Sequence, residues 1–219
     1  MNIIRLPAQR VMPAIELLDQ VTNRRQQTNP RLVALQKSAL AEAVQLLEPV
    51  ALWTRIEPGY FSSIPGPQKR SFSGIQALLG SICTIGDRLE KRTQQYFSAQ
   101  ETIAGYYLDL VGTLAVAKLA QIAAEDLRGQ YAAQHWAPGD DRGDVDLESQ
   151  RFLFDMLPAG QIGMQLTENN IMRPLKSLSF FLVIGQQISG LRCSKACALC
   201  AWNGMCDKRL QQAAQDDIL

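Results

Sequence analysis

Histidine is nearly absent from this chain of 219 residues, which contains only His135. A serine or cysteine nucleophile is commonly activated by a neighbouring base, and no nucleophile–base pair is evident in the sequence. The sequence therefore gives no support to hydrolytic chemistry, and we assign no catalytic residue. We interpret His135 as a loop residue that lines a cleft, with a catalytic base as the alternative.

An excess of charge of either sign is also absent. The chain has 22 lysines and arginines against 21 aspartates and glutamates, for a net charge of +1. Proteins that bind nucleic acid or anionic membranes usually carry a clear basic surplus. We therefore expect neither nucleic acid nor a membrane surface as a partner.

Long hydrophobic runs are missing as well. No uninterrupted run reaches the roughly 18 apolar residues that a membrane-spanning helix needs. The segment Met1–Pro7 lacks the charged start and long apolar run of a secretory signal. We expect a cytoplasmic protein, in which structural disulfides are rare.

Hydrophobic residues make up 47% of the chain, and the sequence predicts three helices. Apolar residues recur every three or four positions over 32–46, and Pro49 follows as a stop signal. Residues 98–101 have the form of a capping box, which predicts a second helix that runs to about Arg128. The third predicted helix covers 147–157.

Other segments favour strands. Residues 51–57 and the apolar run 77–86 are expected to form strands, the second of them buried. Apolar residues alternate with polar or small ones over 162–167 and again over 178–184, the spacing of a strand, and we expect these two to be neighbours. Helices and strands together indicate an α+β fold.

Four of the five cysteines lie within 14 residues, at Cys193, Cys197, Cys200 and Cys206. Thiolates at such short spacings can converge on one centre, and four of them suit a tetrahedral zinc ion or an iron–sulfur cluster. The alternative is a reduced tail, or redox-active thiols. Cys83 lies in an apolar run and is predicted to be a core residue.

Residues 162–185 contain a Gly-Met-x-Leu-Thr-Glu segment, a Met-x-Pro segment and a Ser-x-Ser strand. The matching residues are Gly163, Met164, Leu166, Thr167, Glu168, Met172, Pro174, Ser177 and Ser179. Upstream lies Ala137-Pro138-Gly139. In order and spacing these motifs resemble the reactivation domain of cobalamin-dependent methionine synthase.

Shorter, stand-alone members of that family are a closer likeness. They share a Cys-Thr-x-Gly strand, here 83–86, and an Asp-x-x-Gly-Ser helix, here 109–113, and some have a cysteine-rich tail. The resemblance covers about residues 30–209. It predicts an N-terminal segment over 1–30, the family domain over 31–190, and a cysteine tail with a short helix over 191–219.

The resemblance implies a twisted antiparallel sheet flanked by long helices. It also implies a domain that binds S-adenosylmethionine and presents the methyl donor to an oxidised, inactive cobalamin. The expected partners are a cobalamin- or corrinoid-binding methyltransferase and an electron donor such as flavodoxin or ferredoxin. On this first hypothesis, a cluster on the cysteine tail delivers the reducing electron. The chain would then be an accessory component of corrinoid methyl transfer.

The residues that the resemblance places at the ligand are Asp109, His135, Ala137, Pro138, Gly139, Asp140 and Glu168. Three positions depart from the family pattern: His135 replaces an arginine, Asp140 a tyrosine, and Ala117 a frequent glutamate. Arginine grips a carboxylate as a bidentate fork, which a shorter and mostly neutral histidine cannot reproduce. A second hypothesis is therefore a metal- or cluster-binding interaction module that has lost S-adenosylmethionine binding, and a third is a zinc-stabilised structural protein.

Arg173 and Lys176 flank the Met172–Pro174 turn. They could meet a ligand carboxylate or polar groups of a corrinoid, or they could be ordinary solvated charges. Four aromatic side chains could wall a flat cofactor or pack in the interior: Trp53, Tyr60, Phe61 and Trp136.

Overall fold

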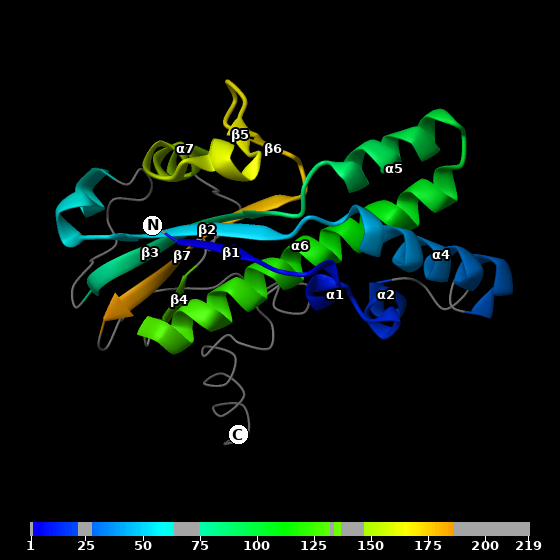
Figure 1. The fold of residues 1–219 in the computed structure, drawn as a ribbon, viewed down its shortest axis with the longest axis horizontal. Helices are drawn as coiled ribbons and strands as arrows, with labels where there is room; N and C mark the ends of the chain where they lie inside the picture. The colour runs from blue at the N-terminus through cyan, green and yellow to red at the C-terminus, as the bar shows by residue number, and fades with distance from the viewer. Residues whose placement is uncertain (1, 22–27, 64–74, 132–133, 137–146, 186–219) are drawn as a thin grey trace, which may run out of the picture.

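The chain folds around one antiparallel sheet, seen in a computed structural model that describes residues 2–21, 28–63, 75–131, 134–136 and 147–185 (Figure 1). The five strands lie in the order β1 (Asn2–Arg5), β2 (Val50–Ile56), β3 (Ile75–Thr84), β7 (Ser177–Gly185) and β4 (Gln134–Trp136). Each neighbouring pair runs antiparallel. The predicted α+β class, with an antiparallel sheet flanked by helices, is confirmed.

Helices cover both faces of this sheet (Figure 1). α6 (Thr102–Tyr131) lies against one face. α1 (Ala8–Val11), α4 (Pro30–Leu46) and α5 (Arg88–Ser98) pack on α6, and α2 (Ile15–Val21) packs on α4. The other face carries α7 (Leu147–Met156) and the 3-10 turn η2 (Ala159–Ile162). A small hairpin of β5 (Gln165–Leu166) and β6 (Met172–Arg173) follows η2, and a second 3-10 turn, η1 (Pro58–Ser63), follows β2.

The central strands are apolar on both faces because both faces are covered. Along β3, Leu79 and Cys83 join the core under the helices, whereas Leu78 and Ile82 join the core under α7. Gly80 is the position at which β3 and α7 come closest together, because a Cβ there would lie 2.4 Å from Cδ2 of Leu153. The absent side chain therefore lets α7 rest directly on the sheet.

The helix predicted over 32–46 is confirmed as α4, and the helix predicted to run to about Arg128 is confirmed as α6. Asn29 begins α4 by accepting a hydrogen bond from the Arg31 backbone N–H at 3.0 Å, and Pro30 occupies the first helical turn. The helix ends at Leu46, three residues before the predicted stop at Pro49. The strands predicted over 51–57, 77–86 and 178–184 and the helix over 147–157 are also present, with ends shifted by one or two residues.

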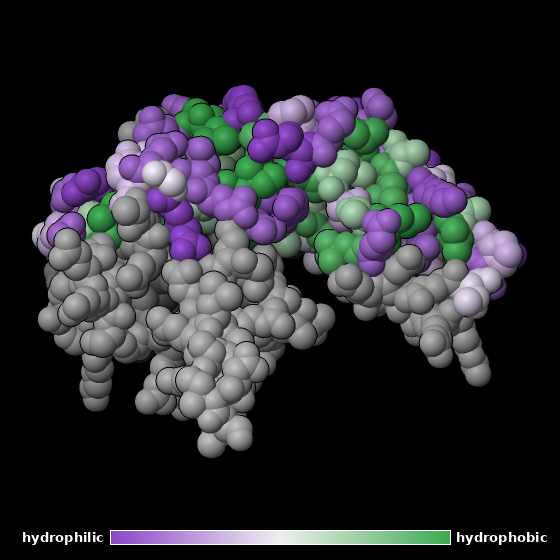
Figure 2. Space-filling model, turned by 90° about the horizontal axis from the view of Figure 1, so that it is seen from below, coloured by the Kyte–Doolittle hydropathy of each residue, from purple (hydrophilic) through white to green (hydrophobic). Residues whose placement is uncertain are grey.

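α6 is long and apolar enough, by length and composition, to cross a membrane, with a mean hydropathy of 1.3 over an 18-residue window. Half of that window is buried inside the fold, and the buried residues are largely alanines, leucines and glycines that pack on the sheet and on α4 and α5. Figure 2 shows the helical side of the molecule, where hydrophobic residues reach the surface in patches separated by hydrophilic ones. These features are consistent with the core helix of a soluble fold.

The capping box predicted at 98–101 is wrong, and α5 is a helix that periodicity did not indicate. Ser98 is the last residue of α5, and the chain then turns through Gln100, whose φ is +64°. The Glu101 N–H bonds the Tyr96 carbonyl at 2.9 Å, and the Gln100 N–H bonds the Phe97 carbonyl at 3.1 Å. This is the Schellman arrangement that ends a helix, here with glutamine where glycine is usual.

Gln100→Gly should stabilise the fold by about 0.5–1 kcal/mol, because glycine adopts a positive φ without the clash of a Cβ. Urea unfolding followed by circular dichroism measures the change. The matched control is Gln94→Gly at an exposed position inside α5, which should destabilise by about 1 kcal/mol. Destabilisation by both substitutions would contradict the assignment of the turn.

The strand predicted over 162–167 is also wrong in extent and in partner. Ile162 ends η2, and Gly163 has a φ of +70°, so the alternating apolar residues lie on a turn. Only Gln165 and Leu166 form a strand, and they pair with Met172–Arg173 rather than with β7. Ile162 and Met164 are nevertheless buried, because the turn directs both into the core beneath α7.

Candidate functional site

Residues 173–177, here called the junction, connect the β5–β6 hairpin to β7 and contact both α5 and α6. The ammonium of Lys176 lies 2.9 Å from Oδ1 of Asp109 and 2.8 Å from Oγ1 of Thr113, both on α6. The Lys176 side chain is only 16% exposed, whereas that of Asp109 is 47% exposed. A lysine that is largely withdrawn from water is stabilised by an anionic partner, and Asp109 supplies it.

Glu90 of α5 holds the other end of the junction. Its Oε2 accepts a hydrogen bond from the Leu175 N–H at 2.8 Å, and its Oε1 lies 3.8 Å from the Arg173 guanidinium. The Glu90 side chain is 16% exposed, so its charge is largely removed from water and neutralised locally. The Ser177 hydroxyl closes the turn by donating to the Pro174 carbonyl at 2.7 Å.

The end of β3 completes the junction. The Lys176 carbonyl accepts the Ile85 N–H at 3.3 Å and the Thr84 hydroxyl at 3.4 Å. The Thr84 hydroxyl in turn accepts the Gly86 N–H at 3.2 Å. Motif residues from 83–86, 109–113 and 172–179, far apart in the sequence, therefore meet in one place.

Ala117 lies on the same stripe of α6 as Asp109 and Thr113, because the three are spaced four residues apart. It is partly buried and offers only a methyl group to a ligand at this face of the helix. Asp109 is the only carboxylate of this stripe between 109 and 117, so a cation at this face of the helix would meet Asp109.

Glu168 lies elsewhere, in the exposed turn of the β5–β6 hairpin. The neighbouring residues order this turn: the Arg151 guanidinium donates to the Asn170 side-chain oxygen at 3.0 Å, and the Ile171 N–H donates to the Thr167 hydroxyl at 3.1 Å. The hairpin packs on the α7 side of the sheet, opposite α6 (Figure 1). The structure does not bring Glu168 and Asp109 together, and their assignment to a ligand site stays a prediction.

His135 lies on β4, the edge strand beside β7, and its backbone pairs with Leu182. The remaining predicted ligand-site residues, Ala137, Pro138, Gly139 and Asp140, lie outside the described residues, as do Cys193, Cys197, Cys200 and Cys206. Within the described part of the chain, no group of three or more histidine, cysteine or acidic side chains could hold a metal ion. The metal prediction therefore stays confined to the cysteine tail.

Cys83 is fully buried on β3, as predicted for a core residue. Burial raises the pKa of its thiol to about 12, and a hydrogen bond with the Leu178 backbone offsets this only in part. Trp53 is also a packing residue, with its ring 5.5 Å from that of Tyr131 in an edge-on contact. Tyr60 is 56% exposed. Phe61 and Trp136 have side chains outside the described set.

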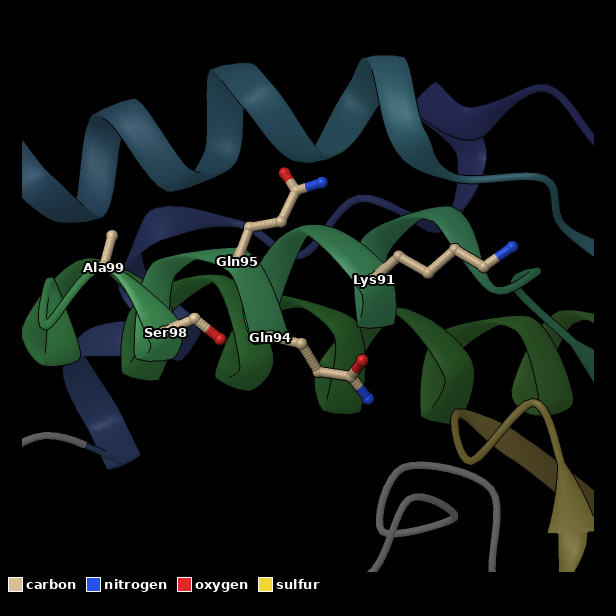
Figure 3. A pocket seen from close by; sticks show the side chains of 5 residues that line it. All are labelled: Lys91, Gln94, Gln95, Ser98 and Ala99. Atoms are coloured by element: carbon tan, nitrogen blue, oxygen red, sulfur yellow. The ribbon is translucent and has the colours of Figure 1, made fainter.

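A shallow depression of about 680 Å³ runs along α5, away from the junction residues. It is lined by Lys91, Gln94, Gln95, Ser98 and Ala99, all from one helix or its end (Figure 3). Gln95 extends toward α4 and Gln94 away from it, so the polar groups do not converge on one point. This open depression lacks the enclosure and the convergent polar groups of a cofactor site.

Sequence reasoning missed Glu90, the acid that anchors Leu175 and Arg173. Its helix was not predicted, and its partner Leu175 lies 85 residues away in the sequence. A faint signal existed, because an acid in the first turn is common at a helix N-terminus.

The fold is similar to that of the MetH reactivation domain solved with AdoHcy bound. The TM-score is 0.60 at 12% sequence identity, over 86% of this chain and 79% of that chain. At this identity the likeness shows a shared fold. No protein-family model and no curated protein matches the chain significantly.

Proposed function

We propose that this protein binds S-adenosylmethionine and acts in trans to reactivate a corrinoid methyltransferase. The observation that carries the proposal is the shared fold with the MetH reactivation domain, over most of both chains, together with the meeting of the family motifs at the junction. AdoHcy, the ligand of that solved domain, is what remains of S-adenosylmethionine after methyl transfer. The proposed location in the cell is the cytoplasm.

The proposed chemistry is a reductive methylation on the partner's cobalamin. An external donor such as flavodoxin or ferredoxin supplies one electron to cobalt, and the methyl group moves from the sulfonium to the reduced metal, leaving AdoHcy. The present chain contributes binding and orientation of the methyl donor. Asp109, half exposed on α6, is the acid that we propose for a positive charge of the ligand.

A second candidate function is favoured by His135, Asp140 and Ala117. These residues replace an arginine, a tyrosine and a glutamate of the family pattern, and an alanine cannot pair with a cation. On this alternative the scaffold has lost the methyl donor and serves as an interaction module, with zinc or an iron–sulfur cluster on the four tail cysteines.

Calorimetric titration of S-adenosylmethionine into anaerobically purified protein separates the two functions. We expect saturable binding at micromolar ligand, weakened about tenfold in Asp109→Asn because a charge-assisted contact is lost. The matched control is Asp126→Asn on the same helix: its carboxylate accepts a hydrogen bond from the Gln130 side chain at 3.0 Å, and its replacement should not affect binding.

Absence of binding at millimolar ligand would reject the reactivation function. Iron, acid-labile sulfide and zinc analysis of the same sample would then decide between a cluster and a zinc site. Metal at one equivalent or more without ligand binding is the result that the interaction-module function expects.

A further inference from the structure

The carboxylate that is proposed to meet the ligand's positive charge already has a cation beside it. Lys176 Nζ lies 2.9 Å from Asp109 Oδ1 and also contacts the Thr113 hydroxyl at 2.8 Å. Lys176 belongs to the junction and Asp109 belongs to α6, and the ion pair between their side chains is what links the two residues. Asp109 is the more exposed partner, at 47% against 16%, so a ligand can reach the carboxylate from solvent while the lysine approaches from the protein.

We propose that Lys176 is an autoinhibitory cation that competes with a cationic ligand for Asp109. This inference rests on the proposed function, and it adds a mechanism that limits the affinity of the same site for its ligand. When Lys176 occupies Asp109, the positive charge of S-adenosylmethionine gains little from the carboxylate. When the ligand occupies Asp109, Lys176 must find other partners.

The contacts around Lys176 make such an exchange feasible. The Thr113 hydroxyl can still accept from the ammonium after Asp109 is taken, so the lysine is not left without a hydrogen bond. The junction backbone stays in place through Glu90 and Thr84, which bond Leu175 and the Lys176 carbonyl and do not involve the lysine side chain. The competition therefore requires a side-chain movement and no change in the fold.

An internal competitor lowers the apparent affinity by the fraction of molecules in which the site is free. Removing the charge of Lys176 while keeping its apolar stem should therefore strengthen binding of a cationic ligand. Calorimetry on Lys176→Met, with S-adenosylmethionine as the probe, should give an affinity about tenfold higher than the unsubstituted protein. The uncharged thioether 5′-methylthioadenosine should change by less than about twofold, because it has no positive charge to place at Asp109.

Lys91→Met is the matched control, because Lys91 forms an ion pair with Asp87 at 2.6 Å on the surface of α5. It should leave both affinities unchanged. Lys176→Gln serves as a second variant if the methionine lowers the melting temperature, because glutamine removes the charge and keeps a polar group for Thr113. In the double variant with Asp109→Asn, the gain should disappear, since no carboxylate remains to be freed.

The outcomes separate this inference from the proposed function. Tighter binding of S-adenosylmethionine to the Lys176 variants, or binding to them alone, supports the competition. Equal or weaker binding to these variants, with clear binding to the unsubstituted protein, overturns the competition and leaves the proposed function in place. No binding to any of the proteins overturns both.

Discussion

Phe181→Ala should lower the free energy of unfolding by about 3–5 kcal/mol, the usual cost of removing a buried phenylalanine. Phe181 is 0% exposed on β7, which lies between β3 and β4, and it belongs to the core that α7 and η2 form on the second face of the sheet. Its ring also lies beside Gly80, since a Cβ at Gly80 would be 3.5 Å from Cε1 of Phe181. Leu153 and Ile56, which lie with Phe181 around Gly80, are themselves fully buried, so neither can move into the cavity without leaving another one.

Urea unfolding measures this loss, and hydrogen exchange locates it. Amides of α7 should exchange faster than those of α4, because α7 is held to the sheet mainly by this smaller core. Phe97→Ala is the control: that ring is 46% exposed at the end of α5, and its removal should cost less than half as much. A loss below about 1.5 kcal/mol for Phe181→Ala would mean that the α7 layer is not packed as described.

Cys83 should react with iodoacetamide about 1,000-fold more slowly in the folded protein than in urea at pH 8, because only the thiolate is nucleophilic. The thiol pKa is raised from 9.0 to about 12 by burial, so the reactive fraction in the fold is correspondingly small. Peptide mass spectrometry distinguishes Cys83 from the tail cysteines. Labelling of Cys83 in the native protein at the rate found in urea would contradict its burial.

The same shift predicts how stability depends on alkaline pH. Because the folded pKa is raised above the unfolded value, the contribution of the neutral thiol is fully present below pH 9.0 and is lost as the pH rises to about 12. The loss is about 1.4 kcal/mol per pH unit within this window. Cys83→Ala should remove this part of the pH dependence, even though it lowers stability at neutral pH.

Local periodicity was enough to predict α4, and the apolar runs were enough to predict the central strands, because each of these elements buries a face. α6 was predicted from its alanine and leucine content and from a capping box that the structure does not contain. Periodicity was not enough for α5, whose stripe consists mainly of Leu89, Thr93 and Tyr96. What holds α5 is its neighbour: Gly112 of α6 leaves room for Leu89, and Tyr96 donates to Glu42 of α4 at 2.6 Å. These are tertiary contacts, and they leave little trace in the sequence of the helix itself.

The candidate site was only partly accessible to sequence reasoning. The resemblance identified Asp109, and the sequence showed that Lys176 flanks the Met172–Pro174 turn. No local sequence pattern indicated that these two residues form an ion pair. Lys176 and Thr113 are 63 residues apart, and their contact follows from how the junction crosses α6. The alternation over 162–167 was misleading for a related reason, since a left-handed Gly163 can place residues two apart on the same side of a turn.

The order of the strands in the sheet also affects how the chain folds while it is being synthesised on the ribosome. β3 lies in the middle of the sheet, yet its second partner is β7, in a register that sets Thr84 opposite Ser177. During translation β1, β2 and β3 emerge first. One edge of β3 then stays unpaired until β7 emerges, which happens only after α5, α6, β4 and α7. An unpaired and strongly apolar edge is prone to intermolecular pairing. Nascent chains that stall before residue 177 should therefore be the form most dependent on chaperones.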